Sequence, residues 1–154
     1  MVALVQRVTR ASVKVDNEIV SEIKNGFLVL LGVYENDGEK ECGILAKKTA
    51  NLRIFSDENG KMNISPANLL EKGEKCEILV VSQFTLCAEC KGQNRPSFIS
   101  AANPEKANEL YEKYVSLLKE TYGIDTYKGV FGADMKVELL NDGPVTIILD
   151  TDKL

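Results

Sequence analysis

Two short stretches of the sequence carry side chains in patterns that could support chemistry. In the first, Ser82-Gln83-Phe84-Thr85 follows the apolar run "EILVV", so three polar side chains and one aromatic come directly after a strand-like segment. Active-site loops are often anchored on a rigid scaffold in this way. The alternative interpretation is a strand that emerges into solvent, with Phe84 returning to the core.

The second stretch is Asn141-Asp142-Gly143-Pro144-Val145-Thr146, which lies between the strand-like runs "MKVELL" and "TIILD". An Asp-Gly turn alone would join two strands as a hairpin. Pro144 has no backbone donor and is tolerated at the first residue of a strand. The local pattern therefore predicts a hairpin turn, and a separate function for the Gly-Pro pair is the alternative.

The composition limits the chemistry that is available. The chain contains no histidine and no tryptophan. Ser–His and Cys–His catalytic arrangements are therefore excluded within it, as are histidine-based metal sites. Thr85 could act as a nucleophile, but an internal hydroxyl needs a general base. Its local candidates are weak, because Glu89 lies a few residues along the chain and Lys91 is normally protonated. We expect no metal and no cofactor.

Length and charge narrow the class of protein. A chain of 154 residues predicts a single domain over 1–154. The net charge of −4, from 19 basic and 23 acidic side chains, argues against broad, sequence-independent nucleic-acid binding. A local basic patch stays open, and its candidates are Lys47, Lys48, Arg53, Lys61, Lys91 and Arg95.

The location is expected to be cytoplasmic. No apolar run approaches the roughly 20 residues of a membrane span. Four cysteines without a secretory signal indicate reduced thiols.

Hydrophobic periodicity predicts the elements that must position the two stretches. "ALVQRV" and "ASVKVD" alternate as strands, and the chain turns at Asp16-Asn17 into a hairpin. "GFLVLLGV" and "CEILVVSQFTL" are apolar strands, a helix is expected from about Gly38 to Leu52, and 56–74 is mostly turn and loop. Asn103 caps a second helix that ends at Gly123, and strands around "TYKGVF", "ADMKVELL" and "VTIILD" close the chain. The prediction is one α+β domain, with a mainly antiparallel sheet and two main helices.

The two stretches, with the residues around them, resemble the D-aminoacyl-tRNA deacylase family. The resemblance rests on "VSQFTL", "NRPSF" and "FGADMKVELLNDGPVTIILD", and it includes "LVQRV", "LLGV", "LRIF" and "GKMN". It covers essentially the whole chain without large insertions. It implies a barrel-like sheet and a homodimer that hydrolyses the ester of D-aminoacyl-tRNA at the tRNA 3′ end, giving free tRNA and the D-amino acid.

The resemblance implies that Gly143 and Pro144 share a cis peptide bond and reach from one subunit into the active site of the other. Main-chain groups there would crowd one face of the substrate Cα and reject L-aminoacyl esters, while a D side chain would point to solvent. Glycine lets the main chain approach a ligand closely. Broad tolerance of D-amino acids follows, and glycyl-tRNA would be hard to exclude.

The resemblance also implies roles for the first stretch. Ser82 and Gln83 would organise the pocket, and Phe84 would pack against the adenosine or the wall of the site. Backbone N–H groups around Phe84 and Thr85 would hold the oxyanion. Attack by water, assisted by the substrate's ribose 2′-hydroxyl, is favoured over a covalent Thr85.

One loop departs from the family pattern. Cys87-Ala88-Glu89-Cys90 replaces an aromatic–small–acidic run, and the glycine of "KGQNRPSF" stands one position early. With no second CxxC and no histidine, we favour ordinary thiols over a metal or redox role. Lys91 and Arg95 are candidate phosphate contacts to tRNA, with a solvated surface as the alternative.

Two other functions stay open at this point. One is a non-catalytic module that binds the tRNA end or another protein. The other is a related deacylase with relaxed chirality, which clears glycine or small L-amino acids.

Overall fold

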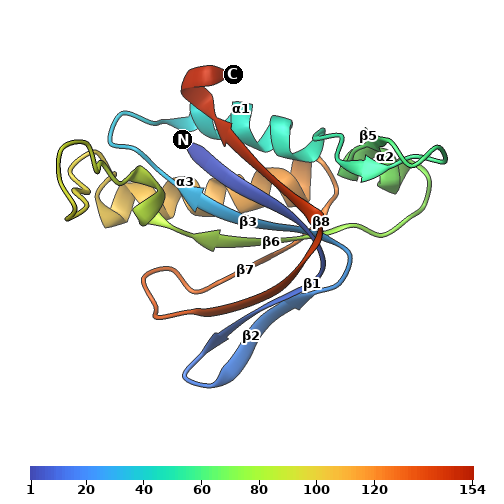
Figure 1. Ribbon diagram of the computed structural model, residues 1–154, viewed down its shortest axis with the longest axis horizontal. Helices are drawn as coiled ribbons and strands as arrows, with labels where there is room; N and C mark the ends of the chain where they lie inside the picture. Colours follow the sequence, from blue (N-terminus) through green and yellow to red (C-terminus); the bar gives the residue numbers. More distant parts are fainter.

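Strand β1 (Val2–Val15) organises the structure, because it pairs antiparallel with three other strands. The computed structural model describes residues 1–154. The other strands of the main sheet are β2 (Glu18–Ile23), β3 (Gly26–Gly32), β6 (Glu77–Ser82), β7 (Asp125–Lys128) and β8 (Lys136–Asp150). Their order is β2-β1-β3-β6-β7, with β8 on β1. Figure 1 shows β1 and β8 running side by side and bending together.

The sheet is mixed and curls almost into a barrel. The pairs made by β1 are antiparallel, as predicted, whereas β3–β6 and β6–β7 are parallel because helical crossovers connect them. Ser21 Oγ donates a hydrogen bond of 2.6 Å to the Lys128 carbonyl, which links β2 with β7 at the two ends of the sheet. The α+β class and the barrel-like sheet expected from the sequence are confirmed.

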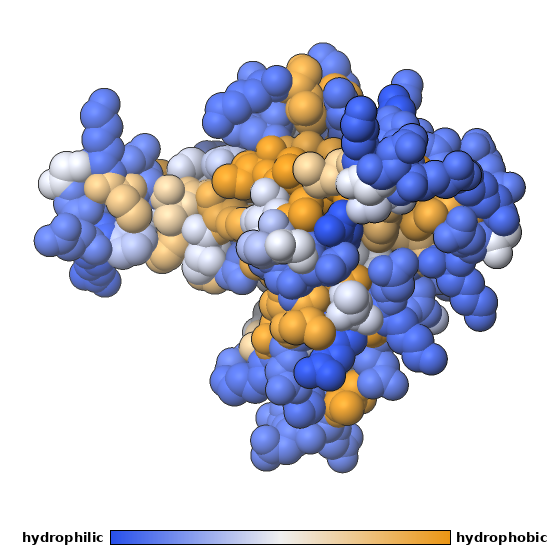
Figure 2. Space-filling model, turned by 45° about the vertical axis from the view of Figure 1, so that its right-hand side comes forward, coloured by the Kyte–Doolittle hydropathy of each residue, from blue (hydrophilic) through white to orange (hydrophobic).

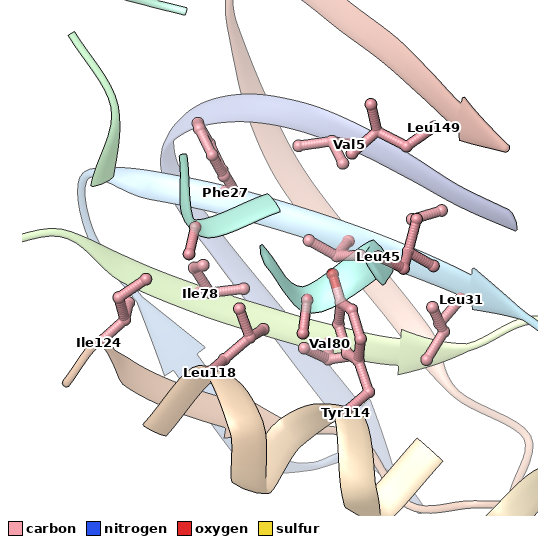
Figure 3. Close-up of a cluster of buried hydrophobic side chains, with 14 of the residues drawn as sticks. Val5, Phe27, Leu31, Leu45, Ile78, Val80, Tyr114, Leu118, Ile124 and Leu149 are labelled. Carbon is pink, nitrogen blue, oxygen red and sulfur yellow. The ribbon is translucent and has the colours of Figure 1, made fainter. Parts of the chain in front are cut away.

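Two main helices cover one face of the sheet (Figure 1). They are α1 (Glu39–Ala50) and α3 (Pro104–Ser116), and a π-helical turn, η2 (Leu117–Thr121), extends α3. Figure 3 shows Leu45 of α1 and Tyr114 of α3 meeting Val80 of β6 in the largest core cluster. Both helices were predicted, and Asn103 caps α3 by accepting a hydrogen bond from Lys106 N. None of the helices has the length and apolar character needed to cross a membrane.

The stretch 56–74 is more ordered than the sequence suggested. It contains part of a small hairpin of β4 (Phe55–Ser56) and β5 (Met62–Ile64), followed by the short helix α2 (Pro66–Glu71). Ser65 caps α2, since its Oγ accepts from Asn68 N at 3.2 Å. Two single-turn 3₁₀ helices, η1 (Phe84–Cys87) and η3 (Thr151–Lys153), complete the structure.

The expected hairpin turn near the end of the chain is wrong. β8 is one continuous strand, and both of its halves pair with β1. Asn141 lies opposite Val8 and Thr146 lies opposite Gln6, so the residues 142–145 form a bulge opposite Arg7. A bulge leaves residues outside the ladder, and a proline there costs no ladder hydrogen bond.

A buried hydrogen bond between the two helices provides a test of this packing. Tyr114 Oη donates to Thr49 Oγ1 at 2.7 Å, and both residues are fully buried. Tyr114→Phe and Thr49→Val should each lower the free energy of unfolding by about 1–3 kcal/mol, because each strands a buried polar group. The double variant should lose clearly less than the sum in urea unfolding. Additive losses would show that the two hydroxyls are not coupled.

Candidate active site

The Ser82–Thr85 stretch leaves the sheet where β6 ends and turns into η1. Gln83 N donates to the Leu31 carbonyl of β3 at 2.8 Å, and the Gln83 carbonyl accepts from Leu86 N at 3.2 Å. The Phe84 side chain is 57% exposed, so it does not return to the core. The turn is therefore fixed to the sheet by its backbone and presents its side chains outward.

This turn offers unused backbone donors. The N–H groups of Phe84 and Thr85 have no acceptor within the protein, as is usual for the first turn of a helix. The Thr85 hydroxyl accepts a hydrogen bond from Gln83 Nε2 at 2.5 Å, and the Glu89 carboxylate accepts from Lys91 N instead. No general base is hydrogen-bonded to Thr85, and the free donors suit a developing negative charge.

A cavity of about 600 Å³ opens beside the turn. Ser82, Gln83 and Phe84 line it, whereas Thr85 does not. Its remaining walls come from the end of β3, the start of α3 and the segment before β8, and the residues are Leu31, Val33, Val81, Phe98, Ala101, Ala102, Pro104, Ala107, Tyr111, Phe131, Gly132, Ala133, Asp134, Met135 and Val137. An apolar lining with a few polar groups at one end suits a flat organic group.

Phe98 ends the "NRPSF" motif, and its sequence context did not predict it as a site residue. Its ring lies edge-to-face on that of Phe84, with centroids 5.0 Å apart. The signal that could have identified it is an aromatic residue at the end of a polar loop. The pair forms an aromatic wall of the cavity.

The bulge in β8 is held by Asn141. Its side-chain amide donates to the carbonyls of Arg7 and Val145, at 2.9 and 3.0 Å. These bonds close the base of the bulge, and the Gly143–Pro144 peptide bond within it is cis. The asparagine of the sequence signature thus has a structural role that its position alone did not reveal.

Arg7 lies beneath the bulge and was not predicted as a site residue. Its side chain is mostly buried and donates from Nη1 to the Ile54 carbonyl at 2.6 Å. Its Nε lies 3.0 Å from Asp142 Oδ2, an ion-pair distance without the alignment of a hydrogen bond. The available signal was a charged residue that alternates in step with the apolar residues Ala3, Val5, Ala11 and Val13 of the same strand.

Gly143 meets Arg7 closely. A Cβ on Gly143 would lie 3.2 Å from Arg7 Nη2 and 2.7 Å from Val145 Cγ2, and its φ is +121°. Only glycine fits this position without strain.

The bulge and the turn lie far apart within one chain. Arg7, opposite the bulge, pairs with Phe27 of β3, whereas Ser82 pairs with Leu31 of β3. That step along β3 spans about 13 Å, and the path β8-β1-β3-β6 adds about 14 Å across the sheet. Neither Gly143 nor Pro144 lines the cavity. One chain does not bring the two stretches together.

The basic residues do not form one patch. Lys91 and Arg95 lie on the exposed loop between η1 and α3, whereas Lys47 and Lys48 lie in the last turn of α1, and Figure 1 shows these two segments well apart.

The two cysteines near the turn differ in their surroundings. Cys87 is buried, and burial raises the pKa of its thiol to about 11, whereas Cys90 is exposed. No group of three or more His, Cys, Asp or Glu side chains is arranged to hold a metal ion.

Comparison with known proteins shows the family. A family model described as D-Tyr-tRNA(Tyr) deacylase matches residues 4–150. A D-aminoacyl-tRNA deacylase of Dictyoglomus turgidum is 53% identical over 154 residues, covering 100% of this chain and 95% of the relative. One of Fusobacterium nucleatum is 52% identical over 151 residues, covering 98% of this chain and 96% of the relative. The chain belongs to the D-aminoacyl-tRNA deacylase family.

Membership confirms the predicted activity, which is hydrolysis of D-aminoacyl-tRNA. Two solved structures are similar over nearly the whole chain. The structure of the c-Myc DNA Unwinding Element Binding Protein has a TM-score of 0.86 at 44% identity. The match covers 97% of this chain and 98% of that protein's chain. The structure of a probable eukaryotic D-amino acid tRNA deacylase has a TM-score of 0.79 at 16% identity. The match covers 96% of this chain and 97% of that protein's chain, and at this identity it supports the fold alone. The roles of individual residues stay predictions.

Gly32 provides a test of how the turn is positioned. A Cβ there would lie 2.9 Å from Val2 Cγ1 of β1, 3.0 Å from Leu86 Cβ and 3.2 Å from the Gln83 carbonyl oxygen, and Gln83 and Leu86 flank the free donors. Gly32→Ala should push the turn away from β3 and lower the single-turnover rate on D-Tyr-tRNA about tenfold or more, since small misplacements in an active site are costly.

Gly43→Ala in α1 is the matched control, because a Cβ there meets nothing within 4 Å. It should keep full activity and gain about 0.5–1 kcal/mol of stability. Full activity of a folded Gly32→Ala would contradict the assigned role.

Proposed function

We propose that two subunits together build each active site. One subunit supplies the Ser82–Thr85 turn and the cavity, and its partner supplies Gly143 and Pro144. The observation that carries this proposal is the separation of the turn and the bulge within one chain, since a site that uses both requires a second copy. Closed two-fold dimers are the commonest protein assemblies, and they would form two such sites at once.

The outer surface of β8 supports a partner on this side. Leu140 and Ile148 are 52% and 66% exposed, and Ile148 pairs with the half-buried Leu4 of β1. Figure 2 shows hydrophobic residues gathered across the middle of one face, between hydrophilic ends. Exposed apolar side chains that gather on one face are typical of interfaces between proteins.

The cavity is the proposed site of the terminal adenosine. Its apolar walls suit a purine, and the exposed ring of Phe84 offers a face on which the base can pack. An ester on the attached ribose would then lie beside the turn, within reach of the free N–H groups of Phe84 and Thr85. Each such donor contributes about 10²–10³ in rate when it meets the oxyanion.

Water is the proposed nucleophile. Thr85 has no base, and its hydroxyl oxygen already accepts a hydrogen bond from Gln83. The ribose 2′-hydroxyl next to the ester can assist the attacking water. The protein then contributes position and charge stabilisation, while the substrate contributes part of the catalyst.

The partner's Gly143 and Pro144 are the proposed chirality filter. A main chain that approaches the substrate Cα without a Cβ blocks the side on which an L side chain would lie. Rejection by a clash needs no recognition of the side chain itself. The same site would accept many D-amino acids and would not exclude glycine.

Single-turnover deacylation of matched D-Tyr-tRNA and L-Tyr-tRNA tests the chemistry. The D ester should be lost quickly and the L ester spared, and Thr85→Ala should retain most of the activity. Gly143→Ala should lose most of it, because its Cβ clashes in a conformation with φ +121°. Cleavage of both esters would refute the filter, and loss of activity in Thr85→Ala would restore the covalent mechanism.

Mixed dimers test the shared site. Gly143→Ala removes the bulge contribution, and Ala133→Trp fills the cavity. Each variant alone should be nearly inactive. Equal mixing after dissociation should restore about a quarter of the wild-type activity, since half of the dimers are mixed and each has one intact site of two. No recovery in mixtures that size-exclusion and mass measurements show to contain mixed dimers would refute the shared site.

A further inference from the structure

The loop 88–100 presents an apolar surface that the proposed chemistry does not use. Ile99 is 87% exposed, the highest value of any large apolar residue in the chain. Phe98 beside it is partly exposed and shares the aromatic wall of the cavity with Phe84. A single exposed apolar residue needs no explanation, but three that adjoin one another and a cavity indicate a contact surface.

The same loop carries positive charge on a chain whose net charge is −4. Lys91 and Arg95 are exposed, and neither forms an ion pair. The one acidic residue of the loop is Glu89, whose carboxylate accepts a hydrogen bond from Lys91 N at 2.6 Å. The loop therefore offers two free cations next to an apolar patch.

The loop is ordered by its backbone. Glu89 and Ser97 exchange two hydrogen bonds of 2.8 and 2.9 Å, and Glu35 N donates to the Ser100 carbonyl at 2.9 Å. Figure 1 shows this segment projecting beyond η1 and the start of α3. A surface held in this way is preorganised for a ligand and loses little conformational entropy on binding.

We infer that the loop 88–100 binds the single-stranded 3′ end of the tRNA, namely the nucleotides that precede the terminal adenosine. This inference rests on the proposed function, which places that adenosine in the cavity. Phe98 lines the cavity on one side and adjoins Ile99 on the other, so a strand that leaves the cavity passes over the loop. Side chains that contact bases, beside cations that contact phosphates, are the usual means of binding single strands.

A polyanion fits this surface better than a second copy of the chain does. The dimer proposed above uses the bulge and the exposed apolar side chains Leu140 and Ile148 of β8, not the side chains of Lys91, Arg95 and Ile99. The loop combines two unpaired cations with a small apolar area, which matches a nucleotide strand in both charge and size.

The experiment compares two substrates that share the ester and differ in the preceding nucleotides. They are D-Tyr-tRNA and 3′-O-D-tyrosyl-adenosine. The test variant is Ile99→Ser/Lys91→Gln/Arg95→Gln. The matched control is Ile19→Ser/Lys47→Gln/Lys48→Gln, which likewise replaces one exposed isoleucine and removes two exposed positive charges elsewhere.

The test variant should need about tenfold more D-Tyr-tRNA for half of its maximal single-turnover rate, with that maximal rate unchanged. Its hydrolysis of D-tyrosyl-adenosine should equal that of the wild type. The salt dependence of tRNA binding should also weaken, by about 0.7 in the log–log slope for each lost phosphate contact. Equal losses on both substrates, no loss on either, or an equal loss in the control would overturn the inference.

A binding measurement keeps this test separate from the proposed function. A labelled four-nucleotide RNA that ends in CCA should bind the wild type about tenfold more tightly than the test variant in fluorescence anisotropy. If the wild type cleaves neither ester, the proposed function fails, and this RNA still decides the inference. Equal binding by the two proteins would overturn it.

Discussion

The register of β1 is the constraint on which the rest of the structure depends. In its first half this strand pairs with β3 on one edge and with β8 on the other. A slip of one residue in either ladder would turn every side chain to the opposite face. The β3 ladder fixes the height at which β6 ends and the Ser82–Thr85 turn begins. The β8 ladder fixes the height of the bulge, so both candidate site segments take their positions from the same strand.

The site achieves its geometry mainly through the backbone. The free donors of the turn and the main chain of the bulge are peptide groups, and the hydrogen bonds that hold the turn and the bulge are accepted by backbone carbonyls. Side chains act chiefly as supports, as Asn141 does beneath the bulge and as Gly32 does by having no side chain. A chain without histidine can therefore offer a site for ester hydrolysis, because charge stabilisation does not require a titrating residue.

The sequence predicted the turns and helix starts that depend only on residues close to them in the chain. The hairpin at Asp16-Asn17 has both residues at positive φ, and α3 begins at Pro104 with Asn103 as its N-cap. The sequence also identified the two stretches and, through resemblance, the family. α2 was missed because it has only six residues and its apolar positions do not establish a helical period.

The features that the sequence did not reveal depend on contacts between residues far apart in the chain. Nothing near Asn141 indicates that both halves of β8 pair with the same distant strand, so a hairpin was the better local prediction. Arg7 lies beside the candidate site only because β1 places it beneath Asp142, more than a hundred positions later in the sequence. The distance between the turn and the bulge also needs the strand order, which no local pattern contains.

The pairing of the first strand with the last has a consequence for how the protein forms. Val2 lies opposite Asp150, so β1 pairs with β8 only after more than a hundred further residues have been made, whereas its partners β2 and β3 follow it directly. Contacts of such long range slow folding, because the entropy of closing the loop is lost before the contacts stabilise the chain. During synthesis the helices and the β3–β6 pair can assemble early. The bulge forms only when β8 has been made and pairs with β1, so this part of the candidate site is added late, after the turn that follows β6.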